Sequence, residues 1–204
     1  MSVRVKVCGI RRPEDAVLAA ELGASAIGLI FWPNSPRALD PVAARTIVAS
    51  LPPFVTAVGV FVNQGRDEIM RTVDAVKLGA VQLHGDERPD EYAGMPCHVI
   101  KAVPVGDGFT AAALGEVPPT TTVLLDAHDP IRRGGSGRVV NWTVAAEAAK
   151  TRRIILSGGL TSENVSAAIA AVQPFAVDVA SGVESAPGIK DHSKLRAFFA
   201  AVRR

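Results

Sequence analysis

The stretch RIILSGGLTSENVSAAIAAVQPFAVDVASGVE, residues 153–184, decides the fold of this chain. Its apolar run IIL predicts a strand that stops at the glycine turn 157–159. Thr161 predicts the N-cap of a helix, because apolar residues follow it at helical spacing. A second apolar run, 175–179, predicts another strand, which stops at the turn 181–183. The order is therefore strand, glycine turn, helix, strand, glycine turn.

Two parallel strands that lie side by side bring both turns to the same edge of a sheet. Glycine lets backbone N–H groups approach a ligand closely, and the start of a helix favours an anion. Glycine-rich turns can also serve only as connections. Two such turns in succession, at the end of a repeating β/α chain, instead favour a phosphate site. The phosphate-binding residues predicted in this way are Gly158, Gly159, Ser181 and Gly182.

The same alternation of strand and helix recurs along the rest of the chain. It predicts further strands at 3–7, 26–31, 56–62, 80–83, 98–103 and 122–125, which makes eight in all. About eight helices are expected, although those after the fourth and fifth strands are predicted to be weak and short. The pattern indicates an α/β protein, a single (β/α)8 TIM barrel in one domain covering residues 1–204.

Composition limits the class of protein further. The chain has 204 residues, of which 48% are hydrophobic and 21% charged, with a formal net charge of +2. These values suit one globular domain and give no reason to expect nucleic acid as a partner. No apolar run has the length of a membrane span or of a signal peptide. Two isolated cysteines indicate a reducing compartment, so we expect a cytoplasmic protein with no membrane association.

Two residues at predicted strand ends are candidates for acid–base chemistry. Cys8 follows the first strand and could act as a base or a nucleophile, although a free cysteine is usually a small buried apolar residue. Asp126 follows the sixth strand and is either a loop anchor or a catalytic acid, because partial burial would keep its carboxyl protonated. Cys97 is expected to be structural.

Other polar residues at the same end of the predicted barrel complete the candidate site. Arg37 could bind a carboxylate, and no chemical step is assigned to His84. Lys101 is expected to pair with a carboxylate. Asp178 lies near the end of the predicted strand 175–179 and is the last residue of this group. Because these residues show no metal-ligand spacing, the sequence predicts acid–base chemistry without a metal or cofactor.

The order of short motifs resembles that of one enzyme family along essentially the whole chain. The motifs are KVCGI at 6–10, SPR at 35–37, VGVFVN at 58–63, VQLHGDE at 81–87, IKA at 100–102, LLDA at 124–127, GGSG at 134–137, LSGGLTSENV at 156–165 and DVASGVESAPGIKD at 178–191. Single motifs are weak, but the ordered set is specific. The chain is similar to the phosphoribosylanthranilate isomerases, metal-free (β/α)8 enzymes of tryptophan biosynthesis.

The resemblance implies a reaction and a role for individual residues. The reaction is the Amadori rearrangement of N-(5-phosphoribosyl)anthranilate to 1-(2-carboxyphenylamino)-1-deoxyribulose 5-phosphate. Cys8 is implied as the base that removes the proton from sugar C2, and Asp126 as the acid that protonates the ring oxygen. Arg37 is implied near the anthranilate carboxylate and Asp178 near the bridging amine, with His84 also at the substrate.

Alternatives remain open at this point. Another phosphosugar barrel enzyme of the epimerase type would rely on metal-binding histidines, and a non-catalytic phosphosugar-binding protein would need neither Cys8 nor Asp126. The partner is expected to be a phosphosugar substrate, and the protein a monomer or a homodimer. The glycines of GGSG at 134–137 predict a mobile lid.

Overall fold

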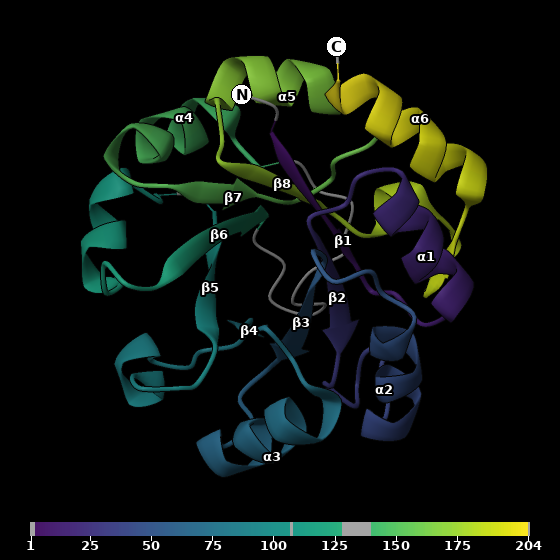
Figure 1. The fold of residues 1–204 in the computed structure, drawn as a ribbon. Helices are drawn as coiled ribbons and strands as arrows, with labels where there is room; N and C mark the ends of the chain where they lie inside the picture. Colours follow the sequence, from purple (N-terminus) through teal and green to yellow (C-terminus); the bar gives the residue numbers. More distant parts are fainter. Residues whose placement is uncertain (1–2, 107, 128–139, 204) are drawn as a thin grey trace.

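A closed barrel of eight parallel strands forms the centre of the protein (Figure 1). The computed structural model describes residues 3–106, 108–127 and 140–203. Each strand pairs with the next along the chain, and the last strand pairs with the first. The strands are β1 (Arg4–Cys8), β2 (Ala26–Ile30), β3 (Thr56–Phe61), β4 (Ala80–Leu83), β5 (His98–Val105), β6 (Thr122–Ala127), β7 (Ile154–Leu156) and β8 (Ala176–Val179). The predicted (β/α)8 barrel is confirmed.

Helices surround this barrel, as the ring of coiled ribbons in Figure 1 shows. The described residues form α1 (Pro13–Glu21), α2 (Pro41–Ala49), α3 (Arg66–Val76), α4 (Trp142–Thr151), α5 (Val165–Val172) and α6 (His192–Val202). The prediction of about eight helices is wrong for two connections. After β4 and β5 the chain forms only the 3₁₀ turns η1 (Pro89–Tyr92) and η2 (Ala111–Glu116). Proline and glycine in both connections leave too little uninterrupted sequence for an α-helix.

Side-chain caps determine where several helices begin. Asp40, Asn141 and Asp191 each accept hydrogen bonds from two backbone N–H groups in the first turn of the helix that follows. The predicted cap Thr161 differs, because α5 begins only at Val165. Thr161 still accepts from the N–H of Glu163 at 3.3 Å, and its carbonyl accepts from the N–H of Val165 at 3.0 Å. A short turn therefore lies between the glycine turn and the helix.

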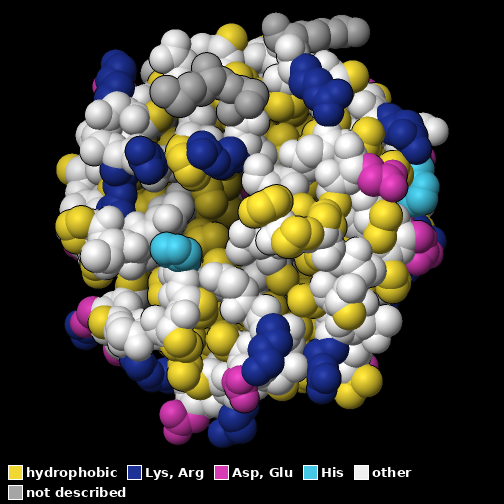
Figure 2. All heavy atoms as spheres, in the orientation of Figure 1, with side chains coloured by type: hydrophobic (Ala, Val, Ile, Leu, Met, Phe, Trp, Pro, Cys, Tyr) yellow, Lys and Arg dark blue, Asp and Glu magenta, His cyan; other side chains and the backbone are white. Residues whose placement is uncertain are grey.

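The barrel has one core inside it and another between its strands and the helices. Seven buried residues form the inner core, and all come from strands β3 to β8: Val58, Ala80, Ile100, Ala102, Leu124, Ile155 and Ala176. The strand residues that alternate with these inward-facing ones point outward and pack against the helices. Figure 2 shows charged side chains around the rim of one face and hydrophobic side chains in the hollow at its centre.

One small element was not expected from the sequence. After β8 the chain forms η3 (Ser181–Val183) and then an antiparallel hairpin of β9 (Glu184–Ala186) and β10 (Ile189–Lys190). This hairpin lies between the last barrel strand and α6. None of the described helices is long and apolar enough to cross a membrane. The predicted lid at 134–137 lies outside the described residues.

Candidate active site

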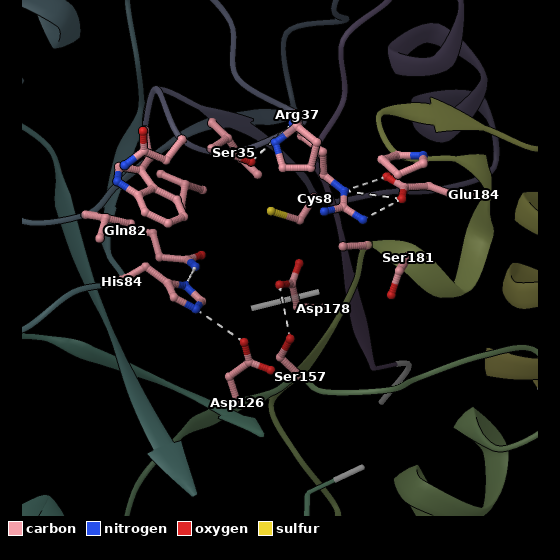
Figure 3. A pocket seen from close by; sticks show the side chains of 18 of the residues that line it. Cys8, Ser35, Arg37, Gln82, His84, Asp126, Ser157, Asp178, Ser181 and Glu184 are labelled. Atoms are coloured by element: carbon pink, nitrogen blue, oxygen red, sulfur yellow. Dashed lines mark hydrogen bonds and ion pairs between the residues drawn. The ribbon is translucent and has the colours of Figure 1, made fainter. Parts of the chain in front are cut away.

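A cavity of about 660 Å³ opens at the carboxyl ends of the barrel strands. Six predicted site residues line it: Cys8, Arg37, His84, Asp126, Asp178 and Ser181. The other three, Gly158, Gly159 and Gly182, belong to the adjoining turns and do not line this cavity. Figure 3 shows the thiol of Cys8 and the carboxyl of Asp126 directed into one space from different strands. The two candidates for acid–base chemistry therefore share one cavity.

Cys8 is the last residue of β1, and its side chain is 6% exposed. Gly28 lies opposite it on β2, and a Cβ atom on Gly28 would lie only 2.7 Å from the Cys8 sulfur. The absence of a side chain at this position makes room for the thiol. Burial raises the pKa of Cys8, and the positive charges of Lys6 and Lys190 only partly offset this effect. The thiol is thus the main form of Cys8 in the unliganded protein at neutral pH.

A buried ion pair lies next to this thiol. Lys6 Nζ lies 2.9 Å from Asp178 Oδ1, and the two residues are 3% and 5% exposed. Burial alone would lower the pKa of Lys6, but Asp178 and Cys8 outweigh burial and raise it. The Ser157 hydroxyl donates to the other oxygen of Asp178 at 3.4 Å. Asp178 is therefore held in a fixed position at the cavity wall.

Each oxygen of the Asp126 carboxyl contacts a nitrogen atom. Oδ1 accepts from the N–H of Ala127 at 2.9 Å, and Oδ2 lies 3.2 Å from Nε2 of His84. The other ring nitrogen of His84 lies 2.7 Å from Nε2 of Gln82. Asp126 was expected just after the sixth strand, but it lies within β6. Successive side chains of a strand point to opposite faces, so Asp126, two residues after the inward-facing Leu124, points into the barrel.

Arg37 lies on the opposite side of the cavity, where it is paired with Glu184 (Figure 3). Its Nε lies 2.9 Å from Oε1 and its Nη2 2.7 Å from Oε2 of this carboxylate. Lys190 also lies 2.8 Å from Oε1 of Glu184. Burial alone would raise the pKa of Glu184, but hydrogen bonding to Arg37 and the charge of Lys190 lower it. Two cations share one carboxylate, so this cluster has an excess positive charge that suits an anion.

The two glycine turns meet as the sequence predicted, because β7 and β8 are neighbours. Gly158 and Gly159 have φ values of +84° and +60°, which favour glycine. A Cβ atom on Gly182 would overlap the backbone carbonyl of Leu160, so the second turn packs directly on the first. Ser181, at the start of η3, reaches the cavity from this pair of turns.

Sequence reasoning missed four residues of the site: Lys6, Gln82, Glu184 and Lys190. Lys6 and Gln82 could have been found, because they lie two positions before Cys8 and His84 and so face the same side of their strands. Glu184 and Lys190 gave no such signal, because they belong to the unexpected hairpin.

Two further expectations concern residues outside the cavity lining. Lys101 pairs with a carboxylate as expected, since its Nζ lies 3.1 Å from Glu87 and donates to the carbonyl of Gly85 at 2.6 Å. Cys97 is partly buried and packs against the outer core. Within the described part of the chain, no group of three or more His, Cys, Asp or Glu residues could hold a metal ion.

Fold and site together define a (β/α)8-barrel enzyme of the kind that handles phosphorylated sugars. A model of the N-(5'phosphoribosyl)anthranilate (PRA) isomerase family matches residues 5–201. The chain belongs to this family.

Individual relatives agree with this assignment. The chain is 50% identical to an N-(5'-phosphoribosyl)anthranilate isomerase of Pseudomonas fluorescens (strain SBW25), over 99% of this chain and 96% of the relative. The phosphoribosyl anthranilate isomerase of Thermus thermophilus is 42% identical, with a TM-score of 0.89 over 98% of each chain. A related isomerase in complex with reduced 1-(o-carboxyphenylamino)-1-deoxyribulose 5-phosphate is 41% identical, with a TM-score of 0.86 over 98% of each chain.

Proposed function

We propose that this cavity catalyses the Amadori rearrangement of N-(5-phosphoribosyl)anthranilate, with Asp126 as general acid and Cys8 as general base. One observation carries the proposal: a thiol from β1 and a carboxyl from β6 enter the same cavity beside two glycine turns. The reaction belongs to tryptophan biosynthesis, and it requires neither a metal nor a cofactor.

The protons and electrons of this reaction balance between two side chains. Asp126 gives its proton to the furanose ring oxygen, the bond from C1 to that oxygen breaks, and a Schiff base forms. The Cys8 thiolate then takes the proton from C2, and the electron pair of the C–H bond moves to form an enolamine. Tautomerisation of the enolamine gives the ketone: C1 gains a proton, which matches the one that Cys8 took, and the C2 hydroxyl loses a proton, which matches the one that Asp126 gave. The product is an isomer of the substrate, so nothing is oxidised or reduced overall.

The base in this scheme is the minor form of Cys8 in the unliganded protein. Its raised pKa keeps most of the thiol protonated, while Lys6 and Lys190 favour the thiolate. A base with a high pKa is a strong proton acceptor once it is ionised, which suits removal of a proton from carbon. Nearby lysines therefore support the function of this base.

The remaining polar groups are assigned to the two ends of the substrate. The turns with Gly158, Gly159, Ser181 and Gly182 hold the sugar phosphate, because they pack together beside the cavity and backbone N–H groups of such turns bind anions. The cluster around Arg37 holds the anthranilate carboxylate, since Glu184 engages only the Nε and Nη2 atoms of its guanidinium. In this assignment Asp178 lies near the bridging amine.

The test of these roles is turnover in two conservative variants. We expect Cys8→Ala and Asp126→Asn each to lower kcat by about a hundredfold or more, while the barrel stays folded. Freshly made phosphoribosylanthranilate is mixed with each variant, and the loss of its fluorescence is followed. Cys97→Ala is the matched control, because Cys97 lies outside the cavity lining. Nearly full turnover in either site variant would refute the catalytic role assigned to the substituted residue.

Two further properties are part of the proposal. We place the protein in the cytoplasm and expect a monomer or a homodimer. Sedimentation equilibrium of the purified protein measures the second property directly, and a mass above that of two chains would exclude both forms.

A further inference from the structure

We propose that Gln82 is a positioning residue, which fixes the proton on His84 and thereby keeps the proton of Asp126 available to the substrate. The proposal rests on the proposed role of Asp126 as general acid. The three side chains form a continuous chain: Gln82 Nε2 lies 2.7 Å from His84 Nδ1, and His84 Nε2 lies 3.2 Å from Asp126 Oδ2. Figure 3 shows both contacts along one wall of the cavity.

The strands explain why these residues meet. Gln82 lies on β4 at an inward position, and His84 follows it by two residues on the same side. Asp126 comes from β6, two strands away around the barrel. His84 therefore spans β5 to reach the carboxyl. Without a second contact, its ring would be free to rotate about its side-chain bonds.

The burial of Gln82 indicates a specific use for its amide. Its side chain is in the barrel, with the residue only 1% exposed, and among the described residues its Oε1 atom has no hydrogen-bond partner. Leaving a buried acceptor unpaired is destabilising. An apolar residue of similar size would avoid this cost. The contact with His84 is a feature of Gln82 that such a residue could not replace.

The direction of this contact decides what His84 can do. An imidazole has one protonated and one unprotonated nitrogen when it is neutral. If the Gln82 N–H donates to Nδ1, the ring proton must lie on Nε2, which then donates to Asp126. His84 in this form cannot accept the proton of Asp126. In the other tautomer Nε2 would be a base and would draw that proton away from the cavity.

The same contact helps after the proton has left. Asp126 is then a carboxylate, with the N–H of Ala127 at one oxygen and Nε2–H of His84 at the other. Hydrogen bonds to a charged acceptor are stronger than those to a neutral one. The chain therefore stabilises the charge that the acid acquires in the reaction.

Other charged groups around the cavity are paired with one another. Lys6 from β1 pairs with Asp178 from β8, and Lys101 from β5 pairs with Glu87. Arg37, in the β2–α2 connection, pairs with Glu184 on the far side. Cys8 faces the same space as a thiol. Among the described residues, Asp126 is the ionisable group in contact with the His84 ring.

The first measurement is the tautomer of His84 in the free protein at mildly alkaline pH. Nitrogen-15 NMR distinguishes a protonated from an unprotonated ring nitrogen, and a His84→Gln variant assigns the signals among the four histidines of the chain. We expect Nε2 to be protonated and Nδ1 to be unprotonated. Protonation at Nδ1 in the wild-type protein would overturn the proposal, whatever the variants do.

The second measurement uses two substitutions of Gln82. In Gln82→Glu the side chain only accepts hydrogen bonds, so Nδ1 of the ring becomes protonated and kcat falls about tenfold. Gln82→Met fills similar space without a donor and gives a mixture of tautomers with a smaller loss of kcat. Gln64→Met is the control, because it removes a Gln amide outside the cavity lining. An unchanged kcat and an unchanged tautomer in Gln82→Glu would refute the positioning role.

The experiments distinguish failure of the proposed function from failure of the positioning role of Gln82. If Asp126→Asn keeps its turnover, Asp126 is not the acid, yet the NMR signals of His84 still report whether Gln82 fixes its tautomer. If a Gln82 variant does not fold, the wild-type tautomer alone still decides the proposal. A loss of stability with kcat of the folded protein unchanged would identify Gln82 as merely structural.

Discussion

Gly28→Ala is the substitution that tests most directly whether the position of the Cys8 thiol controls activity. The new Cβ atom would lie 2.7 Å from the Cys8 sulfur and 3.1 Å from its Cα atom. Non-bonded heavy atoms normally approach to about 3.5–4.0 Å, so the sulfur must withdraw by about 1 Å. A misplacement of about 1 Å at a reacting group can cost about a hundredfold in rate. We therefore expect kcat to fall by about a hundredfold.

The matched control is Gly59→Ala on β3. Its Cβ atom would lie 2.5 Å from Leu78 and 2.7 Å from Phe61, in the outer core and away from the cavity. Both substitutions overpack a strand, so each should lower the free energy of unfolding by about 1–3 kcal/mol. Urea unfolding measures stability, and kcat of the folded fraction measures the site. Equal loss of stability with full kcat in both variants would refute the argument about the thiol.

Three other predictions concern charge and metal. Burial raises the pKa of Cys8, so its alkylation by iodoacetamide should increase with pH through a midpoint above the ordinary value of about 8.5; a midpoint at or below that value would contradict the burial argument. Glu184→Gln leaves Arg37 and Lys190 without their shared carboxylate and should cost about 3–5 kcal/mol at neutral pH. The pKa of Glu184 is lower in the folded than in the unfolded protein, where it is about 4.3. The Glu184 carboxylate therefore stabilises the fold above this pH, and the stabilisation is lost as the pH falls through the folded-state pKa. Urea unfolding should show the free energies of unfolding of the variant and the wild type converging in acid. Chelator treatment should leave kcat unchanged, and activity that returns only on adding a divalent cation would exclude metal-free catalysis.

The barrel could be predicted from sequence because each strand is a short apolar run bounded by turn residues. The strand predicted at 80–83, for example, has the bounds of β4. The connections after β4 and β5 were harder. Proline and glycine leave only short segments there, and whether such a segment forms an α-helical turn or a 3₁₀ turn also depends on how it packs.

The candidate site could be predicted only in part. Strand ends identified Cys8 and Asp126, because the fold alone places such residues at one end of the barrel. The partners of these residues depend on contacts between distant segments. Glu184 pairs with Arg37, from which it is separated by 147 positions, and no local sequence pattern predicts a contact between residues so far apart. Gln82 was overlooked for a different reason: only strand ends were considered, although its position two residues before His84 places it on the same side of the chain.

The ion pair of Lys6 and Asp178 joins residues separated by 172 positions, at the seam where the barrel closes. During synthesis β1 leaves the ribosome before its partner β8, because Asp178 follows Lys6 by 172 positions. Until then, Lys6 has no counter-ion and Cys8 is not enclosed. The nascent chain therefore carries an accessible thiol until β8 has emerged and paired with β1, and Cys8 is exposed to oxidants until the barrel closes.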